Sequence, residues 1–130
     1  MKNAPLNSTP PPDFEAPIVH KIRNLHKLLY RISLKLPKND KLGIYNKIEQ
    51  FMIEILSLSI EASLAPRNNK KVILEKMRVK IEVVKHLIRS SCEIHVINEK
   101  TYLVIQELLQ EISKMANGWI KYMETQNPPN

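Results

Sequence analysis

The sequence predicts an all-α protein, an antiparallel up-down-up-down bundle of four helices. Four segments carry apolar residues at alternating spacings of three and four, which is the pattern of a helix with one buried face. Short polar or proline-containing connections separate these segments, and short connections place successive helices antiparallel. No alternating strand pattern is found elsewhere in the chain.

The first two helices are predicted over residues 18–36 and 41–65. The apolar stripe of the first is Ile18, Ile22, Leu25, Leu29, Ile32 and Leu36. Pro37 ends this helix, and residues 38–40 form a short turn. The second helix continues the rhythm up to Pro66 with Tyr45, Ile48, Met52, Ile55, Ser59 and Ala62.

The third and fourth helices are predicted over residues 70–93 and 98–124. The third carries Leu74, Met77, Ile81, Val84 and Ile88, and stops near the β-branched residues at 94–97. Asn98 is a good N-cap for the fourth helix, with Glu99 in its first turn. The fourth stripe is Tyr102, Ile105, Leu109, Ile112, Ala116 and Trp119.

Prolines are concentrated at both ends of the chain, where they oppose helix and sheet. They stand at Pro5, Pro10, Pro11, Pro12 and Pro17, and again at Pro128 and Pro129. We therefore expect residues 1–17 to form a disordered lead, residues 18–124 to form one domain, and residues 125–130 to fray.

The overall charge favours an anionic partner. Twenty Lys and Arg residues against 13 Asp and Glu residues give a formal net charge of +7. No apolar run reaches the roughly 20 residues that a membrane-spanning helix requires, and the start of the chain lacks the apolar core of a secretory signal. Cys92 is the single cysteine, so an intramolecular disulfide is excluded. These features predict a cytoplasmic protein with no membrane contact.

Two rows of basic residues are candidate binding sites for nucleic acid or for a nucleic-acid enzyme. The first row advances by four residues along the first helix and consists of Arg23, Lys27 and Arg31. The second row advances mainly by seven residues along the third helix and consists of Lys71, Arg78, Lys85 and Arg89. Such arrays neutralise phosphates and release their counterions. An isolated run of lysines is more often a solvated face, but the segregation of charge by helix favours function. Aromatic residues are too scarce to predict base-specific readout.

A second apolar stripe on the third helix predicts an oligomer interface. It lies roughly opposite the core stripe and consists of Val72, Val79, Val83 and Leu87. The second helix also carries extra apolar residues, Ile44, Phe51, Leu58 and Ile60. The alternative is a wide core face within one bundle.

Gly118 and Trp119 interrupt the fourth helix with an unusual pair. Glycine inside a helix costs about 1 kcal/mol relative to alanine, and Trp119 is the only tryptophan. We expect a close structural contact at this site.

The chain lacks the common signatures of catalysis and of cofactor or metal binding. It has no Gly-rich phosphate loop, no CxxC and no histidine pair at i, i+4, so we expect neither cofactor nor metal. One exception is the segment from Arg89 to His95, which resembles the HEPN ribonuclease motif. That resemblance implies a phosphate-clamping arginine and a proton-transferring histidine in metal-independent RNA cleavage.

Four segments together resemble a known family. They are Leu36-Pro37-Lys38, Leu42-Gly43, the run from Lys85 to Arg89, and the ending from Glu111 to Lys121. Over about residues 18–123 the chain resembles the accessory variability determinant proteins of diversity-generating retroelements, whose ending is Glu-[Ile/Val]-Gly-Arg-[Ile/Met]-Leu-Gly-[Gly/Ser]-Trp-Ile. It departs from the family pattern at Ser113, Lys114 and Asn117, and has Lys85 in place of an arginine. The bundle proteins encoded within rRNA intervening sequences, whose role is unknown, are also similar.

The resemblance implies an electropositive homopentameric barrel of four-helix bundles, which is not itself an enzyme. Its implied partners are the reverse transcriptase of the retroelement and the template RNA, with DNA or an RNA–DNA hybrid as further possibilities. Its implied role is to support mutagenic retrohoming. The resemblance leaves open whether Lys85 and Arg89 contact RNA or the polymerase.

Overall fold

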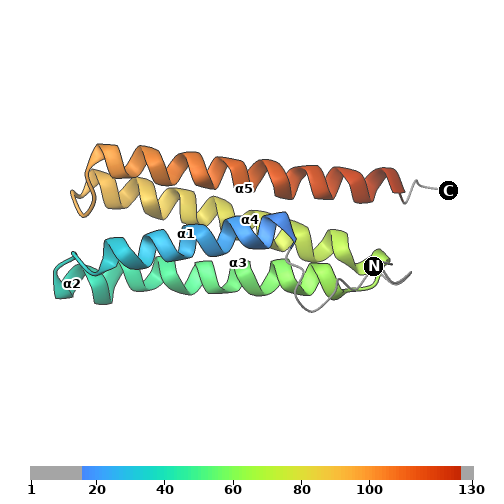
Figure 1. Ribbon diagram of the computed structural model, residues 1–130, viewed down its shortest axis with the longest axis horizontal. Coiled ribbons are helices and arrows are strands. Elements are labelled where there is room, and N and C mark those ends of the chain that lie inside the picture. The colour runs from blue at the N-terminus through green and yellow to red at the C-terminus, as the bar shows by residue number, and fades with distance from the viewer. Residues whose placement is uncertain (1–15, 127–130) are drawn as a thin grey trace, which may run out of the picture.

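A computed structural model describes residues 16–126 as a bundle of four long helices (Figure 1). These are α1 (Pro17–Ser33), α3 (Asn46–Leu64), α4 (Arg67–Glu93) and α5 (Glu99–Gln126). Two short turns, α2 (Lys38–Asp40) and η1 (Lys41–Tyr45), connect α1 to α3. No strand occurs within residues 16–126, so the predicted all-α four-helix bundle is confirmed for this part of the chain.

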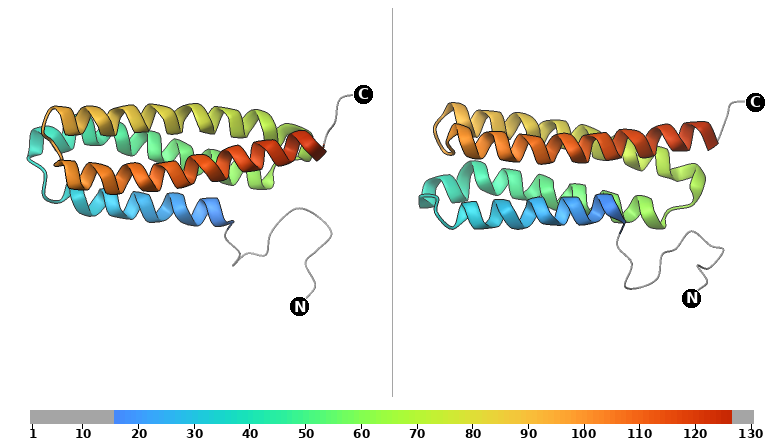
Figure 2. Two further views of the ribbon diagram at one scale, coloured as in Figure 1. Left: turned by 90° about the horizontal axis from the view of Figure 1, so that it is seen from above. Right: turned by 45° about the horizontal axis from the view of Figure 1, so that its top comes forward.

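The four helices occupy the corners of a square. Helices α1 and α4 each pack against both α3 and α5, and Figure 2 shows α4 and α5 as one layer over α1 and α3. Helices α1 and α4 are therefore diagonal to each other. As a result, side chains on their outer faces point to opposite sides of the molecule.

The core is built from the stripes that the sequence predicts. Its fully buried members include Ile22, Leu25, Met52, Ile55, Met77, Ile81, Leu109 and Ile112. Each such side chain contributes about 1.5–3 kcal/mol by leaving water. The last residues of the first and fourth predicted stripes are less buried: Ile32, Leu36 and Trp119 are partly buried and pack against the core.

The helix ends differ from the predicted bounds by a few residues. Pro17 occupies the first turn of α1, where its missing N–H costs nothing. The helix ends at Ser33 rather than at 36, and tighter i→i−3 hydrogen bonds carry the chain to Leu36. Helix α4 begins at Arg67, directly after Pro66, and α5 extends to Gln126. Of the predicted lead and tail, residues 1–15 and 127–130 lie outside the described part.

The connection between α1 and α3 corrects the prediction of a simple turn followed by one continuous helix. Residues 38–40 form a helical turn, and the chain then kinks at Gly43, whose φ of −91° and ψ of −106° are not helical. Glycine is a common position for a helix kink because, without a Cβ, its backbone adopts angles that other residues avoid. The regular helix α3 therefore begins only at Asn46.

The connection between α4 and α5 combines two capping devices. His95 adopts a left-handed conformation with φ of 66°, and the N–H of Val96 donates to the Ser91 carbonyl at 2.8 Å. This is the Schellman pattern, with His95 at the position that glycine usually occupies. The N–H of Thr101 then donates to the Asn98 carboxamide oxygen at 2.8 Å, which confirms Asn98 as the N-cap of α5.

Candidate nucleic-acid interface

The basic row on α1 lies on the surface. Arg23, Lys27 and Arg31 are all exposed, and their spacing of four keeps them on the outer side of the helix. No hydrogen bond or salt bridge joins Lys27 or Arg31 to another residue of the described chain. Their charges are therefore available to an external anion.

The basic row on α4 is partly neutralised by its own chain. The Lys71 ammonium pairs with Glu124 of α5 at 3.2 Å. Lys85 pairs with Glu82 at 3.1 Å and donates to Gln110 of α5 at 3.0 Å, and its side chain is only 17% exposed. Within residues 16–126, only Arg78 and Arg89 of this row are exposed without an ion pair. The row thus does not present the continuous set of cations that its spacing predicts.

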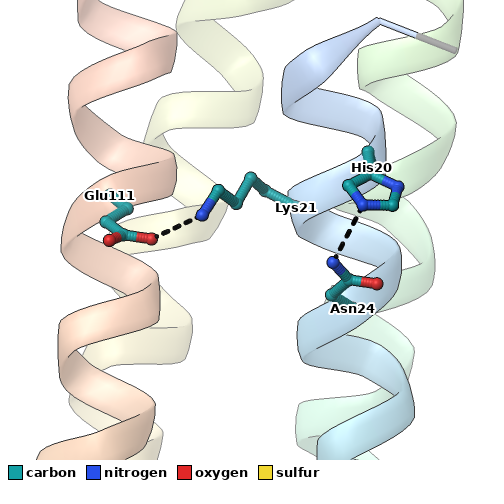
Figure 3. Close-up of polar contacts among 4 residues, drawn as sticks. All are labelled: His20, Lys21, Asn24 and Glu111. Atoms are coloured by element: carbon teal, nitrogen blue, oxygen red, sulfur yellow. Dashed lines mark hydrogen bonds and ion pairs between the residues drawn. The ribbon is translucent and has the colours of Figure 1, made fainter.

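Other cations between the helices are also paired. Figure 3 shows Lys21 of α1 reaching across to Glu111 of α5, at 2.9 Å. Lys80 of α4 pairs with Glu54 of α3 at 2.8 Å and lies over the Phe51 ring. Exposed ion pairs of this kind contribute at most about 1 kcal/mol each. They nevertheless remove positive charge from the sides of the bundle.

One end of the bundle carries a cluster of unpaired positive charge. The end of α1, α2, η1 and the start of α3 carry a set that we call the basic end: Lys27, Arg31, Lys35, Lys38, Lys41 and Lys47. No salt bridge involves any of them within the described chain, and Asp40 is the one acid between residues 27 and 47. The row predicted on the first helix includes two members of this set, Lys27 and Arg31. Lys38 follows the direction of the same row, and the others are indicated only by the excess of basic residues in this segment.

Gly118 lines an open groove of about 620 Å³ between α4 and α5. The cations of this groove are Arg78, Lys114 and Lys121, and Glu75 and Glu124 lie there as well. A Cβ added to Gly118 would meet no atom within 4 Å. The close contact expected at this glycine is therefore not made inside the chain, although Trp119 beside it packs against the core.

The predicted interface stripe on α4 is only half available. Val72 and Val79 are 58% and 60% exposed, whereas Val83 and Leu87 are half-buried and Leu87 packs against the core. The alternative of a wide core face applies to Ile44 of η1 and to Phe51 and Leu58 of α3, which pack against the core. Helix α3 also exposes Ile53, Ile60 and Leu64, of which the sequence reasoning singled out only Ile60.

The residues of the ribonuclease-like motif are exposed and are not joined to each other. No hydrogen bond or ion pair links Arg89 to His95 among the described residues, and His95 serves to end α4. Residues 16–126 hold no group of three or more metal-ligating side chains. No helix in this range combines the length and apolar character needed to cross a membrane.

The comparison with known families decides the relationship of this bundle. The bAvd-like family matches residues 17–123, which include nearly all of the four helices. The chain belongs to the bAvd-like family. The resemblance to accessory variability determinant proteins is thereby confirmed. No curated protein matches this bAvd-like chain.

Proposed function

We propose that this bAvd-like protein is a non-catalytic accessory subunit of a diversity-generating retroelement, which binds the reverse transcriptase and its template RNA to support mutagenic retrohoming. Membership of the family supports the accessory role. The observation that carries RNA binding is the basic end, where unpaired cations face one acid. We further propose that the active form is a homopentamer.

RNA binding at this surface rests on phosphate contacts. Each lysine or arginine that neutralises a phosphate releases a condensed counterion, so affinity falls as salt rises. The basic end carries flexible lysines and few aromatic residues, which favours recognition of the backbone over recognition of bases. The same surface therefore accepts RNA, DNA or an RNA–DNA hybrid. In a ring, several basic ends bind one strand together, and modest contacts add by multivalency.

The test compares unpaired cations with paired ones. We expect Lys27→Gln with Lys38→Gln to weaken binding of a structured RNA and to reduce the magnitude of the slope of log affinity against log salt by roughly 2 per protomer engaged. Binding is measured by gel shift over a salt series. The control is Lys21→Gln with Lys71→Gln, which removes the same charge from residues that Glu111 and Glu124 already neutralise.

Equal loss in both double variants would mean that net charge alone drives binding, and would remove the basic end as the site. Co-purification with a reverse transcriptase of a diversity-generating retroelement tests the protein partner separately. Retention of RNA binding without any polymerase association would contradict the accessory role.

A further inference from the structure

An open groove lies at the same end of the bundle as the basic end. It has a volume of about 710 Å³ and is bounded by the last turns of α1, the α4–α5 connection and the first turn of α5. Four half-buried apolar residues of its lining, which we call the floor, are Ile32, Leu36, Val96 and Ile97. Leu34 stands on its edge and is 58% exposed. An apolar floor with an exposed leucine is unfavourable in water and indicates a ligand with apolar groups.

The charge of the groove is positive. Arg31 and Lys35 line it, neither forms a salt bridge with another described residue, and no acidic residue is part of the lining. The side-chain oxygen of Asn98 is already engaged by the N–H of Thr101. The groove therefore offers cationic donors and no carboxylate to neutralise them, which matches a negatively charged ligand.

The combination of features favours a peptide over nucleic acid. No aromatic residue lines the groove, so bases would find no surface on which to stack. Phosphates alone would contact Arg31 and Lys35 but would leave the apolar floor exposed to water. A peptide that carries both carboxylates and leucine-like side chains satisfies the two parts together.

We propose that this groove docks an acidic, amphipathic segment of the protein partner. Carboxylates of the segment pair with Lys35 and, in bidentate fashion, with Arg31, and its apolar side chains cover the floor beside Leu34. This inference rests on the proposed function in one respect, because it assigns the segment to the reverse transcriptase. It separates the two partners: the polymerase binds in the groove, and RNA binds the remaining cations of the basic end.

Two leucines provide a matched test. Leu34 lines the groove, whereas Leu42 is 64% exposed at the same end but lies outside the groove lining. Leu34→Glu and Leu42→Glu therefore make the same change in charge near the basic end. The probe is a fluorescein-labelled helical peptide about four turns long, with leucine on one face and glutamate on the other. A second peptide with lysine in place of glutamate tests the sign of the charge.

We expect the acidic peptide to bind the wild-type protein. Its affinity for Leu34→Glu should be at least about tenfold lower, because tenfold corresponds to the loss of one anchor. Its affinity for Leu42→Glu should stay within about twofold of that for the wild type. The lysine peptide should not bind. RNA affinity, measured by gel shift on the same proteins, should fall by the same modest factor in both variants, and Leu34→Glu alone should lose the reverse transcriptase on co-purification.

Several outcomes would overturn the inference. They are absence of acidic-peptide binding at low salt, equal peptide loss in both variants, loss of RNA binding in Leu34→Glu alone, or dissociation of the protein's own oligomer by Leu34→Glu alone. The last two would assign the groove to nucleic acid or to a second copy. Failure of all three proteins to bind RNA would instead contradict the proposed function, because the peptide measurement does not depend on RNA.

Discussion

At the scale of single residues, the least expected side chain is Lys70, which is buried in spite of its charge. Its exposed fraction is 8%, and its ammonium donates to the carbonyl oxygens of Ala62 at 2.6 Å and Ser63 at 3.1 Å. These carbonyls belong to the last turn of α3, where the carbonyl groups of a helix have no backbone N–H of the same helix to accept from. Lys70 thus caps α3 from the first turn of α4, and burial lowers its pKa.

Replacing Lys70 with methionine should destabilise the α3–α4 hairpin. Lys70→Met keeps the apolar stem but leaves two helix-end carbonyls without their donor, so we expect the free energy of unfolding in urea to fall by about 1–3 kcal/mol. Lys76→Met, at an exposed position of the same helix, should change it by less than about 0.5 kcal/mol. Equal stability of the two variants would show that water replaces the ammonium.

The same lysine gives a pH signature. Burial holds the pKa of Lys70 in the folded state below its ordinary value of 10.5. Between the folded-state pKa and 10.5, the unfolded chain therefore binds more protons than the folded chain. The contribution of Lys70 to stability therefore rises with pH through that window. Lys70→Met should remove this contribution from a series of urea denaturations at alkaline pH.

At the scale of elements, the core stripes were predictable because every core position of a helix meets the same apolar environment. The Asn98 cap was predictable as well, since it depends only on neighbouring residues. The kink at Gly43 was missed because the predicted stripe begins only at Tyr45, so the apolar pattern contains no information on the backbone at Gly43. The pairing of Lys71 and Lys85 was missed because it depends on the register between α4 and α5, which periodicity within one helix does not contain.

The end of α4 offers a test that separates structure from catalysis. His95 holds a left-handed conformation that costs an ordinary residue about 1–2 kcal/mol, and glycine avoids this cost. We therefore expect His95→Gly to raise the free energy of unfolding by about 1 kcal/mol. His95→Asn, which tolerates the same backbone conformation, should be near neutral.

Both variants also remove the imidazole that the ribonuclease hypothesis requires. Structured RNA incubated in EDTA with wild type, His95→Gly or His95→Asn should remain intact on a denaturing gel. Cleavage by the wild type that disappears in the more stable glycine variant would establish catalysis by His95 and would contradict the accessory role.

At the scale of the whole molecule, the distribution of charge is decided by how the helices pack. The two basic rows lie on diagonal helices, so they do not form one surface. Acids of α3 and α5 neutralise cations along the sides, as Glu54 does for Lys80 and Glu124 for Lys71. Among the described residues, the end built by α1, α2, η1 and α3 keeps six cations without a salt bridge, and Arg78 and Arg89 of α4 are unpaired elsewhere on the surface. Sequence reasoning located the basic segments but not which of their charges remain available.

The proposed oligomer predicts a role for Gly118 that the single chain does not give it. Since a Cβ at this position meets nothing within 4 Å, Gly118→Ala should stabilise the isolated protomer by about 1 kcal/mol through its helix propensity alone. If the glycine allows a second copy to approach closely, the same methyl group should weaken the oligomer. Sedimentation velocity should then show a larger dissociated fraction in spite of the more stable fold, and RNA affinity should fall because multivalent contacts are lost.

Asn117→Ala, in the same groove, adds no bulk and should assemble normally. A Gly118→Ala protein that is more stable and assembles like the wild type would show that the glycine is not an assembly contact.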